Sequence, residues 1–110
     1  MADYVCIAQQ GQVSEQKKAE LTDGLVQIAA EMLGQDAGTV EVAWVSVNEG
    51  FGFTAGEPST STLVARSVPV GFSDDERTRL MTRICDFWQD VTNCSTNEIV
   101  VTVMDGPLPL

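Results

Sequence analysis

The sequence predicts an α+β fold, a tandem β-α-β repeat that forms a four-stranded mixed sheet with two helices on one face. Three observations predict it: runs of alternating apolar residues, apolar residues at helical spacing, and the return of both patterns 59 residues later. The 110 residues suffice for one compact domain. We therefore expect a single domain, 1–110, with repeat halves at about 2–57 and 61–108.

The first half reads as strand, helix and strand. Residues 4–9 (YVCIAQ) have strand character, and Ser14 is placed to cap the helix that follows. The helix is predicted from apolar residues at spacings of four, three and four, namely Leu21, Leu25, Ile28 and Met32. Gly34 suits a left-handed C-terminal cap, and residues 40–44 alternate as a second strand.

The second half repeats this order. Strands are expected at 63–70 and 99–103, with Ser73 and Glu76 forming a capping box at the start of the helix between them. The apolar stripe of this helix consists of Leu80, Ile84, Phe87 and Val91. Asn93 takes the place of the capping glycine, because asparagine also tolerates the left-handed conformation.

The linking segment and the strands have further implications for the assembly. Residues 48–61 are rich in Gly, Ser and Thr and are expected to form a hairpin or loop between the halves. Each β-α-β unit should be a right-handed crossover, so both helices cover the same face of the sheet. The strand residues are apolar on both sides, which leaves a second apolar face and predicts a closed symmetric oligomer.

Composition limits the chemistry. A net charge of −10 makes nucleic acid and anionic membranes poor partners, and no apolar run is long enough to span a bilayer. The absence of histidine excludes Ser-His-Asp and Cys-His catalysis. Three cysteines without CxxC spacing indicate neither a disulfide framework nor a metal site. Since residues 1–10 do not resemble a secretory signal, we expect a cytoplasmic protein that uses no cofactor and no metal.

Two strand-to-helix turns carry a family resemblance. The segments VGFSDDERTRL (70–80) and GQVSEQKKAEL (11–21), together with the first strand YVCIAQQ, resemble the tautomerase superfamily. That superfamily includes 4-oxalocrotonate tautomerase, malonate semialdehyde decarboxylase and the 3-chloroacrylic acid dehalogenases. The resemblance implies a homotrimer in which an N-terminal proline transfers protons and arginines bind the carboxylate of the substrate.

The chain departs from that pattern at the positions that carry the chemistry. The proline position falls on Ala2, or on Asp3 if counted back from Ser14. The family's arginine positions fall on Gln12 or Val13, on Phe72 and on Glu41. If Met1 is removed, Ala2 would present a primary amine, which can act as a base or form a Schiff base.

Four residues are candidates for a site. Arg66 is the single cation outside the two predicted helices and could bind a carboxylate, or else form an ion pair with a partner chain. Tyr4 could orient a substrate through its hydroxyl or be a half-buried packing residue. Glu49 could contact substrate as a carboxylate base or be a solvated loop residue. Ala2, once Met1 is removed, is the candidate for proton transfer.

Three functions are compatible with these residues. The first is an enzyme acting on a small 2-oxo or unsaturated carboxylic acid by tautomerisation, hydration or decarboxylation, with Arg66 and the N-terminus as its machinery. The second is a catalytically silent homotrimer that binds a ligand or a protein. The third is a subunit of a heteromeric assembly. We prefer the first.

Overall fold

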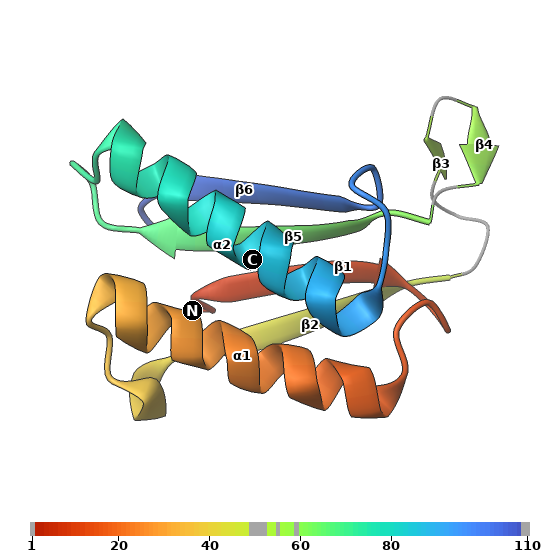
Figure 1. The fold of residues 1–110 in the computed structure, drawn as a ribbon, viewed down its shortest axis with the longest axis horizontal. Helices are drawn as coiled ribbons and strands as arrows, with labels where there is room; N and C mark the ends of the chain where they lie inside the picture. The colour runs from red at the N-terminus through yellow and green to blue at the C-terminus, as the bar shows by residue number, and fades with distance from the viewer. Residues whose placement is uncertain (1, 49–52, 55, 59, 109–110) are drawn as a thin grey trace.

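The computed structural model describes residues 2–48, 53–54, 56–58 and 60–108 (Figure 1). Its elements follow the predicted order, with a short 3-10 helix added and with a small hairpin inside the segment 48–61, where a hairpin or loop was expected. They are β1 (Tyr4–Gln9), α1 (Glu15–Leu33), η1 (Ala37–Thr39), β2 (Val42–Val47), β3 (Phe53–Thr54), β4 (Glu57–Pro58), β5 (Thr62–Val68), α2 (Asp74–Thr92) and β6 (Ile99–Asp105).

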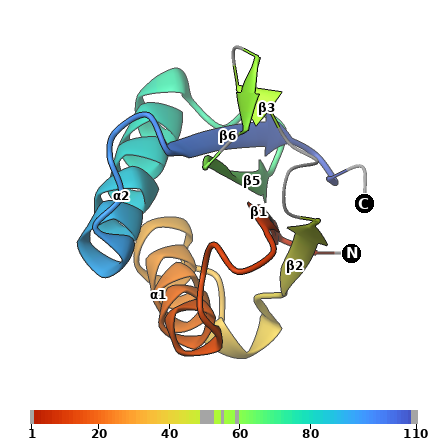
Figure 2. The ribbon, with the colours of Figure 1, turned by 90° about the vertical axis from the view of Figure 1, so that its right-hand side faces the viewer.

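The sheet has the order β2-β1-β5-β6, and β3 and β4 form a separate antiparallel pair. β1 pairs with β2 in parallel, as does β5 with β6, while the central pair β1–β5 is antiparallel and places Tyr4 opposite Arg66. Both helices cover one face of this mixed sheet, as Figure 2 shows. The predicted fold class and its parallel β-α-β units are therefore confirmed.

The two helices repeat each other closely. Each has 19 residues, and their first residues are 59 positions apart. Ser14 Oγ accepts a hydrogen bond from the backbone N–H of Lys17 (3.2 Å), and Ser73 Oγ accepts one from that of Glu76 (3.1 Å). Both helices end in the left-handed conformation, at Gly34 (φ 63°) and Asn93 (φ 58°). The predicted caps are confirmed at all four helix ends.

The core lies between the helices and the sheet. The largest fully buried side chains include Trp88, Tyr4, Leu21, Leu25, Leu80 and Ile84. The helices run in opposite directions (Figure 1), and the ammonium group of Lys17 donates a hydrogen bond to the carbonyl of Val91 (2.6 Å). Where they cross, Gly24 packs against the ring of Phe87, because an added Cβ on Gly24 would lie 1.9 Å from that ring.

The repeat shifts by one residue in the strands that precede the helices. In β1 the side chains that join the core under the helices are Tyr4, Cys6 and Ala8, and in β5 they are Val64 and Val68, with Arg66 between them. The offset is thus 60 here rather than 59. Because side chains alternate along a strand, this shift gives Arg66 the buried position that Cys6 has in the first half.

Some strand boundaries differ from the expectation: β2 covers Val42–Val47 instead of 40–44, β6 extends to Asp105 instead of ending at 103, and β5 ends early. We expected a strand over 63–70, but β5 ends at Val68. Pro69 has no N–H to donate to a ladder, and Gly71 turns the chain with a φ of 96°. The earlier end brings Phe72 and the start of α2 close to the end of β5.

The face of the sheet away from the helices remains apolar. The exposed fractions are 38% for Val45, 50% for Val100 and 39% for Met104. Side chains of this size are usually covered when they cluster on a sheet. Among the described residues, no helix is long and apolar enough to cross a membrane.

Candidate functional site

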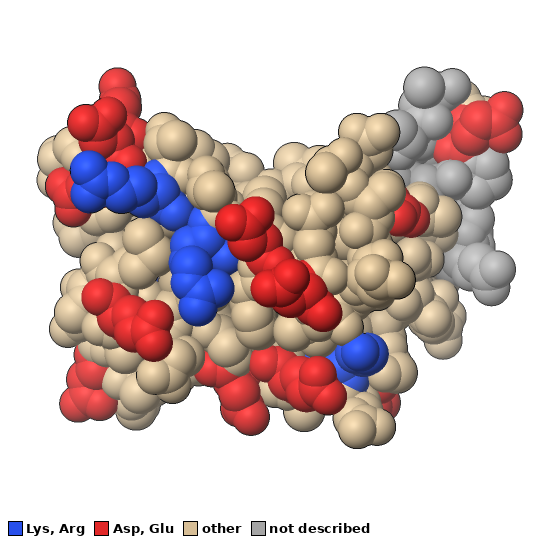
Figure 3. Space-filling view, in the orientation of Figure 1, with Lys and Arg blue, Asp and Glu red and all other residues tan. Residues whose placement is uncertain are grey.

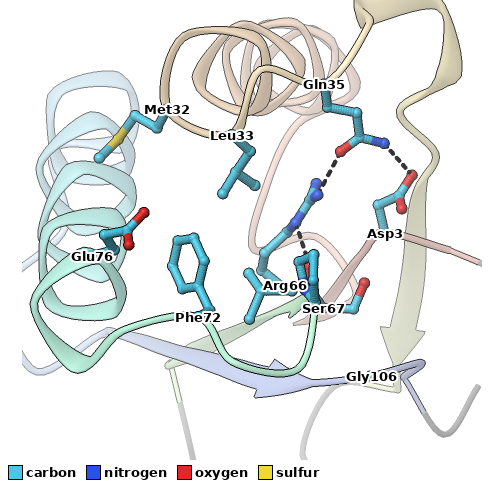
Figure 4. A pocket seen from close by; sticks show the side chains of 11 residues that line it. Asp3, Met32, Leu33, Gln35, Arg66, Ser67, Phe72, Glu76 and Gly106 are labelled. Carbon is cyan, nitrogen blue, oxygen red and sulfur yellow. Dashed lines mark hydrogen bonds between the residues drawn. The ribbon is translucent and has the colours of Figure 1, made fainter.

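A hollow of about 590 Å³ opens at one end of the molecule, between the end of α1 and the start of α2 (Figure 4). Its walls come from the residue before β1, the last turn of α1 and the residues after it, the end of β5, and the first turn of α2. Its principal lining side chains are Asp3, Leu33, Gln35, Arg66, Phe72 and Glu76. We refer to this hollow as the Arg66 pocket.

Arg66 is held inside the protein with one nitrogen unpaired. The residue is 4% exposed. Its Nε donates to the carbonyl of Ser67 (2.8 Å), and its Nη2 donates to Oε1 of Gln35 (2.5 Å). Nη1 is buried and has no hydrogen-bond partner. A buried, unsatisfied donor costs about 1–3 kcal/mol and more when the group is charged, so an acceptor that reached Nη1 would remove this cost.

The neighbours of Arg66 fix its orientation without neutralising it. Gln35 donates from Nε2 to Oδ2 of Asp3 (3.2 Å), and the same oxygen accepts the backbone N–H of Glu41 (2.9 Å). Asp3 thus reaches Arg66 through Gln35, as the dashed lines in Figure 4 show. Within the described part of the chain, the ion pairs are Lys18–Glu15 and Arg77–Asp105, and Arg66 belongs to neither.

The remaining wall of the pocket is mostly apolar. Met32 and Leu33 come from the end of α1, and Phe72 from the loop before α2 (Figure 4). Glu76 lies at the start of α2, where Oε1 of its exposed side chain accepts a hydrogen bond from Ser73 Oγ (3.0 Å). The pocket therefore combines one buried cation, an apolar wall and a carboxylate near the opening.

Tyr4 packs against Arg66 but does not line the pocket. Its side chain is fully buried, and its hydroxyl donates to the carbonyl of Leu25 (2.9 Å). Burial raises the pKa of Tyr4 to about 12, although the nearby Arg66 acts in the opposite direction. This placement matches the packing alternative for Tyr4 better than direct contact with a substrate.

The other candidate residues are placed as follows. Ala2 is half-buried and directly precedes Asp3, which lines the pocket. Glu49 lies outside the described residues, so its proposed contact with substrate remains a prediction. Cys6 is a buried core residue, and burial raises the pKa of its thiol to about 12, which leaves it protonated at neutral pH. In the described ranges, no group of three metal-ligating side chains comes together.

Several pocket residues were not expected from the sequence. Asp3 and Phe72 stand out from the sequence only as positions where the family has a proline and an arginine, Glu76 only as part of the capping box, and Gln35 not at all. Gln35 is 31 residues from Arg66, and nothing in the local sequence pairs them. The one available signal was a charged residue, Arg66, on the apolar face of a strand.

The opposite end of the molecule has a smaller hollow in the equivalent position of the repeat. It measures about 220 Å³, and its lining includes Val13, Thr62, Thr92 and Cys94, which are 59 residues from Phe72, Asp3, Leu33 and Gln35. No lysine or arginine is among the described residues that line it. The two equivalent hollows therefore differ in charge: of the two, the Arg66 pocket is the one lined by a cation.

On the helical face of the molecule, unlike in the two pockets, many charged side chains of both signs are present. Figure 3 shows basic side chains gathered over the first half of α2, with acidic side chains spread over both helices. Arg77 of α2 is bound within the fold: its guanidinium donates to the carbonyl of Val103 (2.8 Å) and pairs with Asp105 (2.7 Å). Arg77 is thus a structural residue.

Solved structures of other proteins share this fold. Native Ps01740 aligns with a TM-score of 0.88 at 28% identity, over 94% of this chain and 93% of that one. N1, a member of the cis-3-chloroacrylic acid dehalogenase (cis-CaaD) family, aligns with a TM-score of 0.87 at 19% identity, over 94% and 74%. A symmetric trimer of fused 4-OT aligns with a TM-score of 0.83 at 16% identity, over 94% and 85%. The chain has the tautomerase-superfamily fold.

The predicted family resemblance is thus confirmed at the level of the fold. No family model matches the sequence, and no curated protein matches it significantly. Sequence similarity to the tautomerase-fold structures is low, with 28% identity to native Ps01740 and 17% to native fused 4-OT. The activity of this tautomerase-fold chain must therefore be argued from its own pocket.

Proposed function

We propose that this tautomerase-fold protein binds a small 2-oxo or unsaturated carboxylic acid in the Arg66 pocket and catalyses its tautomerisation, hydration or decarboxylation. The observation that carries the proposal is the buried guanidinium of Arg66, which lines the pocket and has no acceptor for Nη1. A carboxylate is the best-matched acceptor, because a guanidinium presents paired N–H groups in the geometry of two carboxylate oxygens.

Tautomerisation requires only a group that transfers a proton, and the chain contains a candidate for it. A keto–enol tautomerisation moves one proton between an oxygen and a carbon and needs no electron carrier. If Met1 is removed, the primary amine of Ala2 is the base that we propose for this transfer, since Ala2 adjoins Asp3 at the wall of the pocket. The amine would accept the proton from one atom and return it to the other.

The assembly is proposed from the apolar face of the sheet. Val45, Val100 and Met104 are partly exposed there, and fused 4-OT, which has the same fold, forms trimers. We propose that three copies of this chain form a homotrimer that covers this face. A cytoplasmic location is part of the same proposal and rests on the sequence alone.

A silent binding protein, or a subunit of a heteromer, is the second candidate. It is favoured by the residues at the family's catalytic positions, which are Ala2 or Asp3 in place of proline and Phe72 and Glu41 in place of arginines. In the fold, Glu41 contacts the site through its backbone: its N–H donates a hydrogen bond to the carboxylate of Asp3. Such a protein would bind carboxylates at Arg66 without turnover.

The test is the rate at which the purified, untagged chain ketonises phenylenolpyruvate, a monoacid with an apolar ring, followed by ultraviolet absorbance. Arg66→Met removes the cation from the pocket, and Arg79→Met removes one from the exposed face of α2 as a matched control. We expect a rate above the uncatalysed one that falls in Arg66→Met and is unchanged in Arg79→Met. A rate equal to the uncatalysed one, together with carboxylate binding by calorimetry, would instead support the silent binding protein.

A further inference from the structure

The charges around the Arg66 pocket are arranged unevenly. Of the described residues that line it, Arg66 alone is cationic, while Asp3 and Glu76 are carboxylates. Arg66 is buried, whereas Glu76 is exposed. A ligand whose carboxylate meets Arg66 and whose body extends outward therefore encounters negative charge, and no second cation, along the way.

The space between these charges is suited to an apolar body. Met32 and Leu33 lie on one side of the pocket and Phe72 on another, as Figure 4 shows. Each Å² of apolar surface that a ligand buries there contributes about 25 cal/mol. A volume of about 590 Å³ is within the range of pockets that hold small molecules, so a ring or a branched chain fits beside the carboxylate.

Within the described residues, the carboxylate of Glu76 accepts fewer hydrogen bonds than that of Asp3. Asp3 accepts hydrogen bonds from Gln35 and from the backbone of Glu41, which spread its charge. Glu76 accepts one from the hydroxyl of Ser73. Arg79 shares with it a neighbouring hollow of about 110 Å³ but is in neither of the ion pairs found among the described residues.

We propose that the Arg66 pocket selects acids with a single carboxylate and an uncharged apolar body, and that Glu76 is the residue that rejects a second carboxylate. The proposal rests on the proposed function, because it takes Arg66 as the place where the first carboxylate binds. Like charges brought together at the opening of a pocket discriminate between otherwise similar ligands.

The experiment is calorimetric titration of the full chain with two acids of the same skeleton, 3-phenylpropanoate and 3-(4-carboxyphenyl)propanoate. They differ in one terminal carboxylate. We expect the diacid to bind at least about tenfold more weakly than the monoacid. In Glu76→Gln we expect the diacid to gain about fivefold or more and the monoacid to change less than about twofold.

Glu76→Gln is a conservative change, because the amide oxygen of glutamine can also accept the hydrogen bond from the Ser73 hydroxyl. Asp75→Asn is the matched control: it removes the same charge from the same helical turn, but Asp75 does not line the pocket. We expect it to leave the ratio of the two affinities unchanged. An equal loss of selectivity in Asp75→Asn would mean that net charge, and not Glu76, decides the selection.

The two proposals fail in different ways. If neither acid binds the wild-type chain, Arg66 is no carboxylate site, and the proposed function fails together with this inference. If both acids bind equally well, or if Glu76→Gln leaves the ratio of their affinities unchanged, the proposal that Glu76 rejects a second carboxylate is wrong. The proposal that Arg66 binds a carboxylate is then unaffected.

Discussion

The guanidinium of Arg66 lies over the ring of Tyr4, with its Cζ 4.6 Å from the ring centroid. The two residues face each other in the central antiparallel pair of strands, and the Tyr4 hydroxyl is fixed in turn by the carbonyl of Leu25. A desolvated cation–π contact contributes about 2 kcal/mol. This contact helps to hold a positive charge inside the fold.

Replacement of Arg66 by methionine should leave the protein about as stable or more stable. Methionine fills much of the same space and removes a buried charge with an unsatisfied donor, which offsets the loss of the hydrogen bonds to Ser67 and Gln35 and of the contact with Tyr4. We expect the free energy of unfolding to stay equal or rise by about 1 kcal/mol in urea denaturation, while carboxylate binding is lost. A fall of more than about 2 kcal/mol would mean that Arg66 is a structural residue.

Replacement of Arg77 by methionine should have the opposite effect on stability. Arg77 joins α2 to β6 by donating to the carbonyl of Val103 and pairing with Asp105. Because these groups lose their partner, we expect a loss of about 1–2 kcal/mol in the free energy of unfolding. Arg79→Met is the control, since Arg79 is exposed, and it should change stability by less than about 0.5 kcal/mol.

Tyr4 and Cys6 should make the fold sensitive to alkaline pH. Burial raises the pKa of each to about 12 from ordinary values of 10.0 and 9.0, so the native state keeps protons that the unfolded state releases. Their contribution to stability is present below about pH 9 and is lost as the pH rises toward 12. Urea denaturation at several pH values measures this loss, which we estimate at roughly 2–3 kcal/mol for Tyr4 alone.

The ionisation of Tyr4 also tests its interaction with Arg66. The chain has one tyrosine, so the absorbance of tyrosinate follows Tyr4 without interference. Because Arg66 lowers the pKa of Tyr4, Arg66→Met should move this titration to higher pH. An unchanged titration would show that the two side chains do not interact in solution.

Much of the fold could be predicted because its signals are local. The apolar stripe that contains Leu21 and Leu25, the serine caps and the left-handed residues Gly34 and Asn93 each act within one or two turns of chain. The end of β5 was placed two residues too late, at position 70 instead of Val68. Val70 has high strand propensity, but it follows Pro69 in the turn to α2.

The site was harder to predict because its contacts are not local. Arg66 could be singled out from sequence, since a cation between Val64 and Val68 is unusual on the buried side of a strand. Gln35, which binds it, follows the cap of α1 and looks like an ordinary polar loop residue. Its role depends on how α1 packs over β5, and a single sequence does not reveal this.

Close packing of the helices at Gly24 gives a further test. An added Cβ would lie 1.9 Å from the Phe87 ring, so Gly24→Ala should lower the free energy of unfolding by about 1–3 kcal/mol despite the higher helix propensity of alanine. Gly38→Ala is the control, because the nearest atom to its Cβ is 3.5 Å away. Phe87→Leu should restore part of the loss, and additive effects of the two changes would contradict direct contact.

The most direct test of the account is whether the guanidinium of Arg66 receives a carboxylate. The side-chain ¹H–¹⁵N signals of Arg66, assigned by comparison with Arg66→Met, can be followed by NMR while 3-phenylpropanoate is added. We expect these signals to shift and saturate with the calorimetric affinity, while those of Arg79 and Arg83 stay in place. Arg66 signals that remain unchanged at saturating acid would contradict the account.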